Sequence, residues 1–186
     1  MIGALIGDIA GSRFEWNNHR SKDFEFFTPE CKCTDDSILS ITAAKALLES
    51  NADFSDLSVQ AVRWMREIGC RYPDGWYSRR FKARLLSEDP QPYGANTNGS
   101  AMRVSACAYA TRSLEEAKRL SRAVTEITHN HPEGIKGAEA VTVAVYIARS
   151  VGSMNRTNSA ACFPSHRSTA ADCPPPCRFF MNPPVF

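Results

Sequence analysis

The sequence predicts an all-α fold. Apolar residues recur at helical spacing in most segments of the first 150 residues, and several of these segments begin with a serine, threonine or aspartate that suits a helix N-cap. No persuasive strand pattern occurs in the same region. With 186 residues, the chain is long enough for one sizeable core. We therefore expect one multi-helix domain over residues 1–150, followed by a segment of different character over residues 151–186.

The first expected helix carries glycines along one side. Gly3, Gly7 and Gly11 are four residues apart, which places them on a single helical stripe. Each interior glycine destabilises a helix by about 1 kcal/mol relative to alanine. We therefore expect another backbone or a ligand to approach this stripe closely.

Two acidic residues lie beside the stripe. Asp8 and Glu15 are seven residues apart and share a helical face. A helix that buries the stripe would carry Glu15 at its end, towards the same site as Asp35 and Asp36. For Asp8 the alternative is a structural role, in which its carboxylate ties down a neighbouring loop.

The polar run Thr34-Asp35-Asp36-Ser37 begins the next helix. Thr34 fits the N-cap position, which puts Asp35 and Asp36 in the first turn. The exposed amides and the helix dipole there favour ionised carboxylates, the form that a hard cation needs. Adjacent carboxylates beside a core also need a cation or strong donors. The alternative is an ordinary acidic helix start.

The remaining elements follow from periodicity and end signals. A polar, aromatic-containing loop covers residues 17–33, and a Pro-Asp-Gly turn lies within Tyr72–Trp76. Gly69 is expected to end the helix that begins at Ser55 or Asp56. The helices are expected at about 35–50, 55–68, 77–86, 113–128 and 135–150, with a capping box at Ser113–Glu116.

Two polar loops complete the candidate site. Residues 93–103 are rich in glycine, asparagine and serine, and backbone amides in such a segment can hold a phosphate; an ordinary turn is the alternative. His129, His131 and Glu133 share a second loop. Their spacing fits few metal motifs, so polar ligand contact or loop structure is favoured over metal binding.

Composition excludes several classes of protein. The net charge is +2 and no basic stripe occurs, so direct nucleic-acid binding is not expected. No apolar run of about 18 residues suits a membrane span, and no signal-peptide layout is present. Seven cysteines without regular spacing indicate a reduced chain, so we expect a cytoplasmic location. A zinc site at Cys31 and Cys33 is a minor alternative.

Four motifs occur in a specific order. They are Gly-Asp-x-x-Gly-Ser-x-x-Glu at 7–15, Thr-Asp-Asp-Ser at 34–37, Asn-Gly-Ser-Ala-Met-Arg at 98–103 and Thr-His-x-His-Pro-Glu at 128–133. In this order the chain resembles the ADP-ribosylglycohydrolases, the dinitrogenase-reductase-activating-glycohydrolase-like enzymes. The resemblance implies an all-α fold, two magnesium ions in a cleft, and hydrolysis of the N- or O-glycosidic bond between ADP-ribose and its acceptor.

The resemblance also implies roles for individual residues. Thr34, Asp35 and Asp36 match metal ligands, and Glu15 matches an acid near the metals that acts as base, gate or water-positioning group. With Glu15, the two aspartates form the implied catalytic set. The expected substrate contacts are Tyr93, Gly94, Asn98, Gly99, Ser100 and His129. Because Tyr93-Gly-Ala-Asn-Thr-Asn differs from the usual serine-tyrosine-glycine-asparagine-glycine form, the contacts of that loop are the least specific.

The chain departs from the family pattern near its end. The late Gly-Asp-x-Asp-Thr motif, which completes the family's metal site, is missing. After Val151 there is no leucine or isoleucine, and six of the eleven prolines occur there. We expect a truncated or frameshifted family member with a disordered tail. Cys173 and Cys177 as a redox or zinc pair is the alternative.

Two functions therefore stay open. The first is a magnesium-dependent ADP-ribosyl-acceptor hydrolase, weakened because a second ion would not be held. The second is a non-catalytic ADP-ribose binder or inactive family member. The acceptor and the oligomeric state do not follow from the sequence.

Overall fold

The fold consists of helices throughout the described part of the chain. The computed structural model describes residues 1–159, and side chains as far as Val151. Residues 1–159 contain seven α-helices and two 3-10 helices and no strand, which confirms the all-α prediction. Of the predicted disordered tail, residues 151–159 continue α7 as helix, and the rest, with Cys173 and Cys177, lies beyond the described residues. The helices are α1 Ile2–Gly11, η1 Ser12–Phe14, α2 Asp35–Glu49, α3 Leu57–Arg71, α4 Arg79–Leu86, η2 Asn98–Ser100, α5 Ser105–Ala110, α6 Leu114–Glu126 and α7 Pro132–Ser159.

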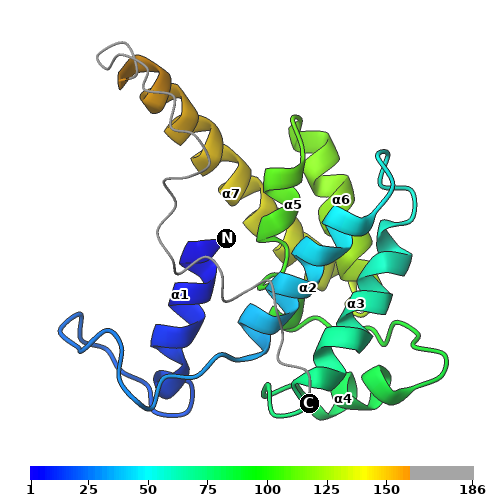
Figure 1. Cartoon of the computed structure of the whole chain (residues 1–186), viewed down its shortest axis with the longest axis horizontal. Coiled ribbons are helices and arrows are strands. Elements are labelled where there is room, and N and C mark those ends of the chain that lie inside the picture. Colours follow the sequence, from blue (N-terminus) through cyan, green and yellow to red (C-terminus); the bar gives the residue numbers. More distant parts are fainter. Residues whose placement is uncertain (160–186) are drawn as a thin grey trace, which may run out of the picture. The chain divides into compact units, whose positions relative to one another are not determined.

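Helix α2 lies at the centre of the packing. It contacts α1, α3 and α5, while α6 packs against α3 and α5, and α4 packs against α3 (Figure 1). The core is apolar and close-packed around these contacts, with Leu57, Met65, Val104, Leu120 and Val124 among its fully buried residues. The candidate site lies where α1, the start of α2 and the segment around η2 approach one another.

Side chains cap several of the helix starts. Thr34 is the N-cap of α2, as predicted, and its hydroxyl oxygen accepts a hydrogen bond from the amide of Asp36. Ser113 caps α6 in the same way, accepting from the amide of Glu116 at 3.2 Å. Helix α7 begins at Pro132, earlier than predicted, because proline at the first helical position needs no hydrogen-bond partner for its nitrogen.

Gly69 does not end α3. The helix continues to Arg71, and a Cβ at Gly69 would lie 3.0 Å from Cδ1 of Leu85. Glycine at this position therefore lets α4 pack closely on α3. In the sequence, a glycine needed for such packing cannot be distinguished from one that ends a helix. Helix α5 was not predicted as a separate element, since it is only six residues long and has no side-chain cap.

The glycine stripe of α1 does not support the predicted close approach. A Cβ at Gly3, Gly7 or Gly11 would meet nothing within 4 Å among the described residues. Ala10 is the one buried residue of α1, and Ile2 is 74% exposed. Helix α1 is thus held chiefly through its contact with α2.

None of the helices in residues 1–159 combines the length and the apolar character that a membrane-spanning segment needs.

Candidate functional site

Asp8 joins α1 to the start of α2. Its Oδ2 accepts hydrogen bonds from the amides of Thr34 at 3.0 Å and Ser37 at 3.1 Å. Its Oδ1 accepts the hydroxyl hydrogen of Thr34 at 2.5 Å. The carboxylate therefore satisfies the free amides of the first turn of α2 from outside the helix. This is the loop-tying role that the sequence left open for Asp8.

Burial and neighbouring negative charges raise the pKa of three acidic residues at this junction. Asp35 has a pKa raised to about 7, first because it is partly buried and then because Asp36 lies beside it. The pKa of Asp36 is also raised, by burial and by the charge of Asp8. Glu15 follows η1 and is exposed, and its pKa is raised by desolvation and by Asp36 and Asp8. Three of the predicted site residues thus share one electrostatic environment.

The donor set at this junction suits a hard cation only in part. Oxygen donors of the kind that magnesium prefers come from Asp35, Asp36 and Thr34. Oγ1 of Thr34 and Oδ2 of Asp36 are 3.4 Å apart, a separation at which one ion can contact both. However, residues 1–151 contain no group of three or more histidine, cysteine or acidic side chains close enough to hold a metal ion. The oxygen donors present are of the kind that magnesium takes, but they are fewer than its near-octahedral coordination requires.

Asn98 connects the second loop to this acidic junction. It begins η2, and its Nδ2 donates a hydrogen bond to Oδ1 of Asp36 at 3.3 Å. Ser100 is buried, and its hydroxyl donates to the carbonyl of Thr97 at 3.1 Å. Two predicted parts of the site, the start of α2 and the 98–100 turn, are therefore adjacent.

His129 lies beneath the turn and is almost completely buried. Its Nε2 is 3.1 Å from Oγ1 of Thr97, and its Nδ1 is 2.7 Å from Oγ1 of Thr128. Burial, with a contribution from Arg103, lowers the pKa of His129 to about 4, so the ring is neutral at neutral pH. A Cβ at Gly99 would lie 2.9 Å from Cε1 of this ring. His129 therefore supports the turn from below, with both ring nitrogens already paired.

Tyr93 and Gly94 complete the loop. The amide of Tyr93 donates to the carbonyl of Thr128 at 3.3 Å, and the amide of Gly94 donates to Oδ1 of Asn130 at 2.8 Å. Gly94 has a φ of +65°, which glycine adopts without strain. The guanidinium of Arg80 lies 4.9 Å from the centre of the Tyr93 ring. These contacts fix the loop to the segment that holds His129.

Arg103 was not predicted as a structural residue of the site. It is fully buried, and its Nη2 donates to the carbonyl of Val124 at 3.2 Å and to the hydroxyl of Thr128. Its position at the carboxyl end of α6 satisfies carbonyls that the helix leaves unpaired. The signal in the sequence is a lone arginine in the otherwise small and apolar run before α5.

The other candidate ligands do not converge. Nδ1 of His131 accepts a hydrogen bond from the amide of Glu133 at 3.2 Å, and the carboxylate of Glu133 pairs with Lys136 at 2.6 Å. Both therefore serve the start of α7, as the loop-structure alternative requires. Cys31 and Cys33 are free thiols and belong to no metal-binding group in residues 1–159.

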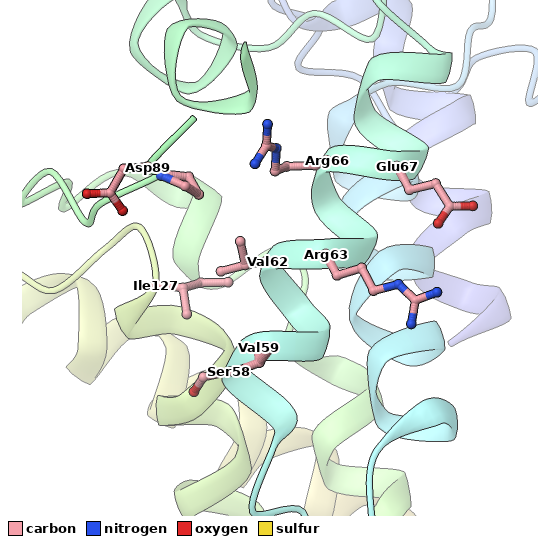
Figure 2. Close-up of a pocket in the computed structure, with 9 residues that line it drawn as sticks. Ser58, Val59, Val62, Arg63, Arg66, Glu67, Asp89 and Ile127 are labelled. Carbon is pink, nitrogen blue, oxygen red and sulfur yellow. The ribbon is translucent and has the colours of Figure 1, made fainter. Parts of the chain in front are cut away.

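Two concave surfaces differ in their relation to the site. A pocket of about 670 Å³ lies on α3, where Val62 and Arg66 face the segment at Asp89 (Figure 2). None of the predicted site residues lines it. A second groove of about 520 Å³ is lined by residues on either side of Glu15 in the chain, Phe14 and Asn17, and by Arg13, Glu30, Lys32 and Trp76.

Comparison with known proteins identifies the family of the chain. The ADP-ribosylglycohydrolase family model matches residues 1–172, most of the chain. The match extends past residue 150, where the expected domain ends. A comparison with curated protein sequences finds no match. The protein belongs to the ADP-ribosylglycohydrolase family, and the family name describes hydrolases of glycosidic bonds to ADP-ribose.

Proposed function

We propose that the protein hydrolyses the glycosidic bond between ADP-ribose and an acceptor group. The observation that carries the proposal is the convergence of Glu15, Asp35 and Asp36, which come from two separate segments of the chain and share one electrostatic environment. Positive charge develops at the anomeric carbon when such a bond breaks, and carboxylates stabilise that charge. Family membership supports the same reaction.

The proposed roles follow the position of each residue. Glu15 is exposed beside the two aspartates, with a raised pKa, so it is suited to accept a proton from an attacking water. The backbone of the 98–100 turn, held next to Asp36 by Asn98, would receive the nucleotide part of the substrate. Tyr93 and Gly94 would contact the same part, and His129 would act by keeping the turn in place. The groove lined by Phe14, Asn17 and Trp76 is a suitable place for the acceptor.

Magnesium is the proposed cofactor, held by Thr34, Asp35 and Asp36. When bound, it would orient hydroxyl groups of the ribose and polarise the reacting bond. Asp35 and Asp36 would then be ionised, because an ion replaces the proton that their mutual repulsion favours. The other roles are proposed for side chains of the protein. Glu15 would accept the proton of the attacking water, and the hydrogen bond from Asn98 would keep Asp36 oriented towards the turn.

A second candidate is an ADP-ribose binder without catalytic activity. This candidate is favoured because the side chains described, residues 1–151, include no group of three or more histidine, cysteine or acidic residues that could hold a metal ion. Magnesium prefers near-octahedral oxygen coordination, so a site with a partial ligand set holds the ion loosely. Misplacing a reacting group by about 1 Å reduces the rate on the order of 100-fold.

Release of free ADP-ribose from mono-ADP-ribosylated peptides distinguishes the two candidates. Peptides with arginine and serine linkages should be tested with and without millimolar magnesium. The hydrolase proposal predicts magnesium-dependent release that Glu15→Gln reduces by about 100-fold. Glu88→Gln is the matched control, since Glu88 is exposed in the segment after α4 and does not line the groove. Release that is unaffected by Glu15→Gln would contradict the assignment of the base.

Calorimetry with ADP-ribose tests the binder. Heat of binding to ADP-ribose, weaker heat with AMP, and no release of product would favour a non-catalytic protein. No heat at a protein concentration of about 100 μM would exclude a dissociation constant tighter than about 1 mM, and with it the binder.

A further inference from the structure

We propose that Asp8 is a positioning residue, which turns the Thr34 hydroxyl so that its oxygen serves as an acceptor at the metal site. The inference rests on the proposed function, because it concerns the same magnesium site. Asp8 is not one of the expected metal ligands, and the proposal gives it a defined effect on one of them, Thr34.

The first step concerns the single hydrogen of the Thr34 hydroxyl. Two carboxylates compete for it: Oδ1 of Asp8 at 2.5 Å and Oδ2 of Asp36 at 3.4 Å. Among the described residues, these two carboxylates are the acceptors that the structure gives this hydroxyl. Hydroxyl-to-carboxylate hydrogen bonds are strongest at about 2.5–2.7 Å. The hydrogen therefore belongs to the bond with Asp8.

The second step concerns what faces Asp36 as a result. With its hydrogen on the Asp8 side, Oγ1 of Thr34 has two lone pairs, of which one accepts the amide hydrogen of Asp36 at 3.4 Å and the other can face Oδ2 of Asp36. Two acceptor oxygens then face each other across 3.4 Å without a hydrogen between them. Such a pair repels unless a cation lies beside it. Without Asp8, the Thr34 hydroxyl would donate its hydrogen to Asp36. With Asp8 present, Oγ1 of Thr34 and Oδ2 of Asp36 are both acceptors.

The third step concerns why Asp8 is fixed in this role. Its other oxygen, Oδ2, accepts from the amides of Thr34 and Ser37, which belong to the rigid first turn of α2. The carboxylate therefore cannot rotate away without leaving these amides unpaired. Asparagine at this position has nearly the same shape, and its amide oxygen can still accept from both amides. Its NH2 group would then donate to Thr34, and the hydroxyl hydrogen would turn to Asp36.

Asp8→Asn therefore reverses the hydrogen bond with little change in shape, and magnesium binding measured by calorimetry is the readout. We expect the affinity of Asp8→Asn to fall by about tenfold or more, as for other residues that orient metal ligands. Thr34→Val should lose a similar factor, because it removes the acceptor. Thr34→Ser keeps the hydroxyl and should bind magnesium like the parent. Thermal melts confirm that each variant is folded at the temperature used.

The double variant separates positioning from simple loss of charge. If Asp8 acts through the Thr34 hydroxyl, Asp8→Asn/Thr34→Val should bind magnesium about as well as the weaker of the two single variants. If Asp8 acts only through its charge, the two losses multiply, and the proposal is wrong. It is also wrong if Asp8→Asn binds like the parent, or if the parent gives no magnesium heat. ADP-ribose release decides the proposed function independently, because a chain that binds magnesium in this way but releases no product would refute only the hydrolase assignment.

Discussion

Asp35 is the residue whose environment differs most from that of an ordinary surface acid. Partial burial and the neighbouring charge of Asp36 raise its pKa to about 7, above the ordinary 3.8. The folded protein therefore binds a proton there between these two values while the unfolded chain does not. Stability contributed by this proton is fully present below about pH 4 and is lost as the pH rises through about 7.

Asp35→Asn should remove this pH dependence in metal-free buffer. At about pH 8 the variant should melt about 3 °C higher than the parent, since partial exposure leaves on the order of 1 kcal/mol of repulsion to relieve. At about pH 4 the two should melt alike. Millimolar magnesium should raise the melting temperature of the parent but not of the variant, because an ion that binds only the folded state stabilises it.

Asp74→Asn is the matched control, since Asp74 is exposed in the turn after α3. It should leave both the pH dependence and the magnesium shift as in the parent. Equal magnesium shifts in the parent and in Asp35→Asn would remove Asp35 from the ligand set.

Some of the site residues could be placed from the sequence because their roles are local. Thr34 as N-cap and the two aspartates of the first turn follow from four consecutive residues. The partners of these residues did not follow. Asp8 is 26 residues from Thr34, and Asn98 is 62 residues from Asp36. Contacts at such separations depend on how the helices pack, which periodicity does not encode.

Among the elements, the 98–100 turn depends on a glycine. Gly99 lies against the His129 ring, and a Cβ there would be 3.0 Å from its Nε2. A contact under about 3.4 Å forces one of the two groups to move, and His129 is held on both sides by threonines. The turn must therefore shift when Gly99 is enlarged.

Gly99→Ala should weaken binding of ADP-ribose by about tenfold or more, because it displaces the backbone that we propose to hold the nucleotide. Gly137→Ala is the matched control, since Gly137 lies in α7 and a Cβ there meets nothing within 4 Å. That control should bind normally. Calorimetry measures both, and equal binding by the two variants would exclude the turn from the binding surface.

Helix α1 provides a test of the glycine stripe. If the space beside Gly7 is open in solution, Gly7→Ala should stabilise the protein by about 0.5–1 kcal/mol, the usual gain from alanine in a helix. Urea unfolding measures the change. A loss of stability would show that another chain or segment packs on the stripe.

The elements also show where sequence patterns mislead. The starts of α2 and α6 were predicted because a side chain caps each of them. Gly69 was interpreted as a helix end because the sequence does not distinguish a glycine that stops a helix from one that admits Leu85. The stripe of α1 was interpreted as a close contact for the same reason. Glycine indicates a missing side chain, and only the packing determines why it is missing.

At the scale of the molecule, the candidate site combines one element that is firmly held in the core with another that has few buried contacts. The turn at 98–100 belongs to the packed core, because Arg103 and His129 connect it to α6. Helix α1, which carries Asp8 and leads to Glu15, buries only Ala10 and packs mainly on α2. Elements with few buried contacts open first, at a lower free energy than global unfolding.

Hydrogen exchange should therefore protect α1 less than α2 and α3. On heating, ADP-ribose release should be lost several degrees below the melting transition followed by circular dichroism, because the site loses Asp8 and Glu15 before the core unfolds. Binding of ADP-ribose without hydrolysis should persist in this interval. Simultaneous loss of helicity and activity would indicate that α1 is an integral part of the core.

The burial of Arg103 has a consequence for the order of events in the proposed reaction. Its guanidinium joins the end of α6 to the segment that carries the nucleotide turn, so opening this half would expose unpaired carbonyls and move a buried cation. A preorganised surface of this kind loses little entropy when a ligand arrives. The nucleotide would therefore bind first to the 98–100 turn, whose conformation is fixed before the ligand arrives. Glu15, which follows the more loosely attached α1, would act on the substrate after this first step.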